Sequence, residues 1–200
     1  FDAGMLYYCP QIWSSDNTDA IERLRIQYGT SFGYPMSSVS AHVSVCPNHQ
    51  NHRVTPFKTR GICAMQGTFG YELDLSKMTD EEKKMAGEQI AFFKEQGRLF
   101  QFGDYYRLTS PFENRDYTVW EYAAQDGSEA CMSVVYTDMY ANAASEIVKW
   151  KGLDPKKVYQ MQLDGEDAGN FSGAALMHAG ILLPLPEQNY DAFQIYLKAE

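Results

Sequence analysis

The residues before and after Gly103 follow two different patterns, and this change constrains the fold more than any other feature of the chain. Before Gly103, short apolar runs alternate with amphipathic helical segments in repeated strand–loop–helix order. Such an alternation is typical of a parallel α/β arrangement. After Gly103 the helical period fades, and short segments rich in β-branched and aromatic residues follow one another. We therefore predict an α/β domain over 1–103 and an all-β domain over 104–200.

The α/β domain contains three candidate strands and three candidate helices. The strands are expected to end near Trp13 and to span 41–46 and 68–75, and the helices to span 19–28, 55–66 and 79–97. Thr79 and Glu82 form a capping box, which marks the start of the last helix. Three strand–helix units cannot close a barrel of eight. We therefore interpret this domain as the last units of a truncated (β/α)8, or TIM, barrel.

The second domain is predicted to be an antiparallel β-sandwich. Its expected strands cover 105–109, 117–123, 130–137, 158–163, 174–183 and 193–198. Turn dipeptides such as Asp126-Gly127 and Asp164-Gly165 separate them, which is typical of a sandwich. Its aromatic residues are assigned to the core rather than to a sugar-stacking platform. His178 is expected to be a core histidine of the fifth strand.

Composition restricts the class of protein. The formal net charge of -9 opposes binding to nucleic acid or to an anionic membrane surface, since both attract Lys and Arg. The sequence contains neither a signal-peptide pattern nor an apolar run of about 18 residues. The cysteines are few and irregularly spaced, at Cys9, Cys46, Cys63 and Cys131. We therefore expect reduced thiols and a cytoplasmic location.

The segment from Trp13 to Asp19 carries the strongest candidate for chemistry. Asp16 follows the end of a predicted strand, where α/β barrels place their catalytic groups. The alternative is structural: Asp16 caps the next helix and Asp19 is an acid of its first turn. Spacing alone favours the cap, because helix caps are far commoner than catalytic acids.

A second candidate is a group of histidines and one cysteine. His42, Cys46, His49 and His52 are three or four residues apart, a spacing that suggests zinc. Pro47 interrupts any helix that would place them on one face. No metal site is predicted for this reason.

The residues around Asp16 closely resemble the melibiase-type α-galactosidases, glycoside hydrolase family thirty-six. The resemblance rests on blocks that follow the family's order over roughly the first seventy-five residues: Tyr7–Leu24, Gln27–Ser31, Ala41–Ser44, Pro47–Gln50, Thr59–Gly61 and Gly67–Asp74. Residues 104–200 resemble the family's C-terminal β-domain only in their strand-rich pattern and in their position in the chain. The resemblance implies a (β/α)8 barrel followed by a β-sandwich.

The resemblance also implies roles for single residues. The family's acid/base aspartate falls on Asp16, and an aromatic residue of its sugar site falls on Trp13. Asp19 matches a second acidic position that is not catalytic, while His42 and His49 lie in blocks near the site. The implied activity is hydrolysis of terminal α-linked galactose from melibiose- or raffinose-type sugars, with retention, by double displacement and without a metal or cofactor. The full-length family members imply a homo-oligomer.

The start of the chain indicates a fragment. It opens with Phe1-Asp2-Ala3-Gly4-Met5 and no initiator Met, and the family's nucleophile belongs to an upstream Lys-x-Asp motif that this sequence lacks. We therefore expect the fragment alone to be inactive. Two alternatives stay open: an α-N-acetylgalactosaminidase on the same fold, and a non-catalytic carbohydrate-binding module.

Overall fold

A computed structural model describes residues 2–200, and the chain divides into two compact units, 1–101 and 102–200. Each unit is described by itself. Among the described residues, no helix is both long enough and apolar enough to cross a membrane.

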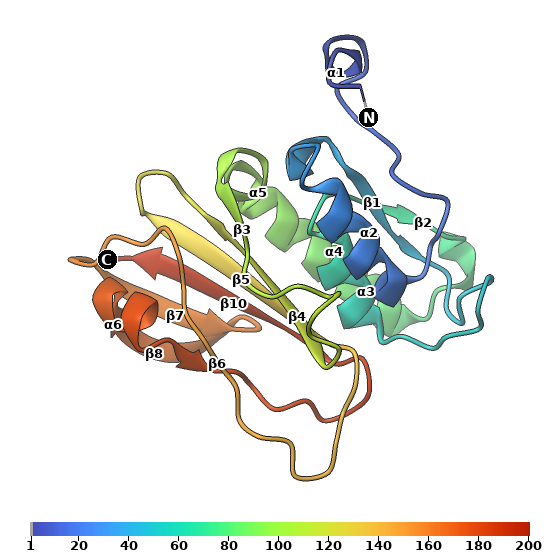
Figure 1. Ribbon diagram of the computed structural model, residues 1–200. Helices are drawn as coiled ribbons and strands as arrows, with labels where there is room; N and C mark the ends of the chain where they lie inside the picture. Colours follow the sequence, from blue (N-terminus) through green and yellow to red (C-terminus); the bar gives the residue numbers. More distant parts are fainter. Residues whose placement is uncertain (1) are drawn as a thin grey trace. The chain divides into compact units, whose positions relative to one another are not determined.

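The first unit is built from parallel strands that alternate with helices (Figure 1). Its strands are β1 Ser40–Ser44 and β2 Thr68–Glu72, which pair in parallel, and Ile12 joins β1's start through a parallel bridge to Val39. Its helices are α1 Met5–Tyr8, α2 Ala20–Thr30, α3 Phe57–Ala64, α4 Asp80–Glu95 and, at the boundary, α5 Gly97–Phe102, with short 3-10 turns η1 Met36–Ser38 and η2 Leu75–Lys77. The predicted strand–loop–helix order is confirmed.

The two faces of the β1–β2 pair differ in chemistry. Ala41 and Val43 of β1 are buried and form a hydrophobic cluster with Phe57 of α3 and with residues of α4. Side chains alternate along a strand, so His42 of β1 and Glu72 of β2 lie on the opposite face. The helices therefore cover one face of the parallel strands, and polar residues occupy the other.

Local sequence determines where the helices begin. The capping box is confirmed. Thr79 Oγ1 accepts from the Glu82 backbone N–H at 3.1 Å, and the Glu82 carboxylate accepts from the Thr79 backbone N–H at 3.0 Å. Helix α2 begins after Asp19, whose carboxylate accepts from the backbone N–H of Glu22 at 2.8 Å. The predicted end of this helix at Tyr28, with Gly29 as its stop, is two residues too early, because the helix continues to Thr30.

The second unit is a six-stranded antiparallel sheet in the order β3-β4-β5-β10-β7-β8. The strands are β3 Asp104–Arg107, β4 Tyr117–Ala123, β5 Glu129–Tyr136, β7 Val158–Leu163, β8 Glu166–Ser172 and β10 Ala192–Ala199. A two-stranded ribbon pairs β6 Ile147–Val148 with β9 Ile181–Leu182, and helix α6 Gly173–His178 precedes β9 (Figure 1). The antiparallel all-β prediction is confirmed.

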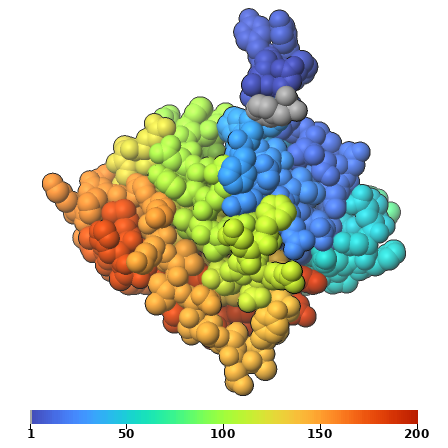
Figure 2. Space-filling model, viewed as in Figure 1, coloured from blue at the N-terminus to red at the C-terminus, as the bar shows by residue number. Residues whose placement is uncertain are grey.

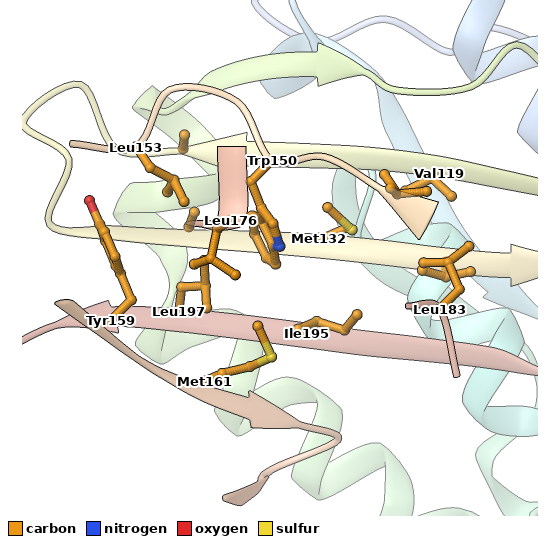
Figure 3. Packing of buried hydrophobic residues seen from close by; sticks show 14 of the residues in the cluster. Val119, Met132, Trp150, Leu153, Tyr159, Met161, Leu176, Leu183, Ile195 and Leu197 are labelled. Carbon is orange, nitrogen blue, oxygen red and sulfur yellow. The ribbon is translucent and has the colours of Figure 1, made fainter. Parts of the chain in front are cut away.

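The core of the second unit lies between this sheet and a thinner second layer. Figure 3 shows Trp150 and Leu176 pointing at the sheet residues Met132 and Ile195. The second layer consists of the β6–β9 ribbon, α6 and the segment around Trp150, rather than of another large sheet. Trp150 is only 1% exposed, so it fills the centre of this core.

Two predictions in this unit are wrong. The expected strand 174–183 is helix α6 followed by the short β9, and Ser172 caps the helix by accepting from the Ala175 N–H at 3.2 Å. His178 ends α6 and is exposed, so it is not a core histidine. Strand β8 was not predicted, because all its residues are exposed and no apolar alternation marks it.

We expect residues 104–200 to fold without the rest of the chain. The hydrophobic cluster around Trp150 is drawn from this segment alone, which gives it a core of its own. Far-ultraviolet circular dichroism of the expressed segment should show an antiparallel β spectrum and a cooperative thermal transition. A helix-dominated or unordered spectrum would contradict this expectation.

Candidate functional site

The polar face of the first unit forms an open pocket of about 570 Å³. Three consecutive parallel segments supply its lining: the stretch at Ile12, β1 and β2. The lining includes Gln11, Trp13, Ser40, His42, Thr68 and Glu72. The pocket is therefore a direct product of the strand alternation that turns the apolar residues toward the helices.

Asp16 is joined to this pocket through Trp13. The Trp13 indole Nε1–H donates to Asp16 Oδ1 at 2.8 Å, and Asp16 is exposed. Asp16 does not cap α2, because Asp19 does, so the structural alternative for Asp16 is wrong. Within residues 2–200, Trp13 lies beside Asp16 but leaves it exposed.

Asp19 has a structural task. It is 2% exposed, and its carboxylate both caps α2 and pairs with the guanidinium of Arg53. Its backbone N–H donates to the Asn17 side chain at 2.9 Å. These contacts occupy the Asp19 carboxylate and fix the end of the segment that carries Asp16.

His42 supports the indole of Trp13. The two rings stack with centroids 4.7 Å apart and planes 8° from parallel. His42 Nε2 lies 2.7 Å from Glu72 Oε2, although the direction falls outside hydrogen-bond geometry. Burial lowers the pKa of His42; the Glu72 carboxylate opposes this shift and the charge of Arg23 adds to it. The ring is therefore neutral at neutral pH, which suits close stacking on an indole.

Arg23 connects the Asp16 segment to β1. It is 4% exposed and donates to the carbonyl oxygens of Ser15 at 3.0 Å and Ser40 at 2.7 Å. Its guanidinium carbon also lies 5.8 Å from the centre of the Trp13 ring. The sequence prediction did not include Arg23, although an arginine on the buried face of an amphipathic helix was a detectable signal.

The loop between β1 and α3 is hydrogen-bonded to the Asp16 segment. Figure 2 shows the cyan surface of this loop beside the blue surface of the chain's first thirty or so residues. Asn48 and Gln50 of the loop bind Thr18, and Gln50 also donates to the Asp16 carbonyl at 3.0 Å. His49 is exposed and does not line the pocket, so the structure brings His42 but not His49 to the site.

The predicted site has no converging metal ligands among the residues that the structure describes. Within residues 2–200, no three His, Cys, Asp or Glu side chains form a group able to hold an ion. The cysteines are unpaired thiols; Cys63 and Cys131 are buried and Cys9 is exposed.

Comparison with known families matches both units of the chain. The Melibiase family matches residues 1–103, and the glycosyl hydrolase family 36 C-terminal domain matches residues 117–197.

Individual relatives are similar over the whole chain. The bifunctional alpha-galactosidase/sucrose kinase AgaSK of Mediterraneibacter gnavus is 52% identical over 97% of this chain, and alpha-galactosidase AgaA of Geobacillus stearothermophilus is 48% identical over 100%. The crystal structure of AgaA superposes with a TM-score of 0.94 over 100% of the chain. The chain spans only 20% of AgaSK and 27% of AgaA. The chain thus belongs to the melibiase family of α-galactosidases, glycoside hydrolase family 36, and comprises part of the catalytic domain together with the C-terminal domain.

Proposed function

We propose that this chain is part of a retaining α-galactosidase that removes terminal α-linked galactose from raffinose- and melibiose-type sugars, with Asp16 as the acid/base. The named relatives are α-galactosidases, and variants of AgaA have been solved in complexes with raffinose and with stachyose. Both sugars are substrates of the expected class.

The hydrogen bond from Trp13 to Asp16 is the observation that carries the proposal. An indole N–H donates and never accepts, so Asp16 Oδ1 is an acceptor in both protonation states. Because the carbonyl oxygen of a carboxylic acid is the stronger acceptor, we place the acidic proton on Oδ2. This arrangement presents one oxygen of the carboxyl for proton transfer and holds the other in place.

The proposed reaction has two steps. A carboxylate attacks the anomeric carbon while the glycosidic bond breaks and the proton on Asp16 Oδ2 passes to the leaving oxygen. Water then attacks the anomeric carbon of the β-linked intermediate, and Asp16 takes a proton from this water. The bond to the attacking carboxylate breaks, and galactose leaves in the α configuration. Trp13, which is 48% exposed, is proposed to contact the sugar with the part of its ring that His42 leaves uncovered.

The attacking carboxylate of this scheme is proposed to come from a part of the enzyme outside this chain. A retaining site holds its two carboxyls about 5 Å apart. Asp19 caps α2 and is paired with Arg53, so its carboxylate is already engaged, while Glu72 is exposed beside His42.

The stereochemistry of the product tests the proposal. Proton NMR recorded immediately after the full-length enzyme meets melibiose should show α-galactose first, followed by slow mutarotation. Initial β-galactose would contradict double displacement. The 200-residue chain alone should release no p-nitrophenol from the aryl α-galactoside. Release above the buffer rate would show that the nucleophile lies within the chain.

A further inference from the structure

We infer that Gln50 is a positioning residue for Asp16: its side-chain amide clamps the backbone directly after the Asp16 side chain, from the Asp16 carbonyl to the Thr18 N–H. The inference rests on the proposed role of Asp16 and deepens it. Gln50 is not expected to touch the sugar.

The clamp has two ends. Gln50 Nε2 donates to the Asp16 carbonyl at 3.0 Å, and Gln50 Oε1 accepts from the Thr18 backbone N–H, also at 3.0 Å. A side-chain amide carries a donor and an acceptor in one plane, so it can bind a carbonyl and an N–H two residues apart as a neighbouring strand would. Rotation of the peptide plane between Asp16 and Asn17 has to break the bond to the Asp16 carbonyl.

Gln50 is itself held in place. Asn48 is 5% exposed, and its Oδ1 accepts from the backbone N–H of Gln50 at 2.8 Å. The Asn48 amide nitrogen donates to Thr18 Oγ1 at 3.0 Å, so Thr18 is bound by both loop residues. The pairing of Arg53 with Asp19 joins the far end of the same loop to the same segment. The clamp is therefore a preorganised part of the loop rather than a single flexible contact.

The Asp16 segment depends on such contacts because it has no regular secondary structure. Residues between Ile12 and α2 belong to neither helix nor strand, and a bend occurs at Asp16. Local turns made by Ser15 and Asn17 shape the segment but do not attach it to the strands. Arg23 attaches the segment to β1 at Ser15, and Gln50 attaches it to the loop after β1 next to the reacting carboxyl. A displacement of about 1 Å in a catalytic group can reduce a rate about a hundredfold.

Two Gln50 variants in the full-length enzyme test the clamp. Gln50→Ala removes both bonds, whereas Gln50→Glu keeps the acceptor for Thr18 and loses the donor to Asp16 at nearly constant volume. We expect both to lower kcat on melibiose roughly 10- to 100-fold with little change in KM. The first step on an activated aryl galactoside, which needs no proton, should fall less than about threefold. Val54→Ala, at an exposed residue of the same loop, is the matched control, and its kcat and KM on both substrates should equal those of the wild type.

A double-mutant cycle separates positioning from a general structural effect. If Gln50 acts through Asp16, then Gln50→Ala should change activity little when added to Asp16→Ala. Equal losses in both backgrounds, or equal losses on both substrates together with a lower Tm, would overturn the inference and leave the role of Asp16 intact. If Asp16→Ala itself shows no dependence on the leaving group, the proposed function fails and the inference fails with it. Gln50→Glu keeps the test valid if the alanine variant does not fold.

Discussion

Replacement of Asp16 by alanine in the full-length enzyme is expected to slow melibiose hydrolysis by about a hundred- to ten-thousand-fold. The leaving sugar is a poor leaving group and needs the proton that Asp16 supplies. Activated aryl galactosides depart without this proton, so their first step should be affected much less. The comparison of the two substrates by steady-state and burst kinetics measures the protonation step directly.

The second step of the same variant loses its base, so a small anion should restore turnover. Azide needs no deprotonation and attacks the β-linked intermediate from the opposite face, which yields α-galactosyl azide. Asp19→Ala is the control three residues away. Because Asp19 caps α2 and pairs with Arg53, its loss should lower Tm without changing the ratio of the two substrate rates. Equal and modest losses for Asp16→Ala on both substrates, without azide rescue, would contradict its assignment.

Replacement of Glu121 by glutamine is expected to stabilise the 200-residue chain at pH 7 and above. Glu121 lies in β4, is 0% exposed, and accepts from the backbone N–H of Lys151 at 3.0 Å. Burial raises its pKa to about 8, although the Lys151 N–H and charge oppose the shift. Glutamine carries no charge and keeps an acceptor for the same N–H.

The direction of the pH dependence follows from the raised pKa. The unfolded carboxyl titrates near 4.5 and the folded one near 8, so the chain takes up a proton on folding between these values. The contribution of Glu121 to stability is complete below about pH 4.5 and is lost as the pH rises toward 8. At about 1.4 kcal/mol per pH unit, the loss at pH 7 is on the order of 3 kcal/mol.

Urea unfolding of the wild type and Glu121→Gln between pH 5 and 8.5 measures this effect. The two proteins should differ little at pH 5 and by roughly 1–3 kcal/mol at pH 7, with the variant more stable. Glu166→Gln in the exposed strand β8 is the matched control and should leave the free energy of unfolding unchanged. A difference that does not change with pH would show that the Glu121 carboxyl is ionised in the folded chain.

Local patterns account for the parts of the fold that were predicted correctly. The bounds of β4 and β7 match the predicted strands residue for residue, because β-branched, aromatic and turn residues mark them in the sequence. The capping box at Thr79 was predicted because both of its partners lie within four residues of each other. Helix α6 was mistaken for a strand, since its short apolar run has no period that distinguishes the two structures.

The sequence by itself determined the strand–helix order of the first unit, the antiparallel nature of the second and, through a recognisable motif, Asp16 as the candidate acid. Only the tertiary structure decided how Asp16 is held. Gln50 lies 34 residues from Asp16, and Glu72 lies 30 residues from His42, yet each pair is in contact. Such partners carry no local signal, because their positions depend on which strand edges and loops the folded chain brings together. The structure also decided that Asp19, not Asp16, caps α2, since capping depends on backbone geometry at a single residue.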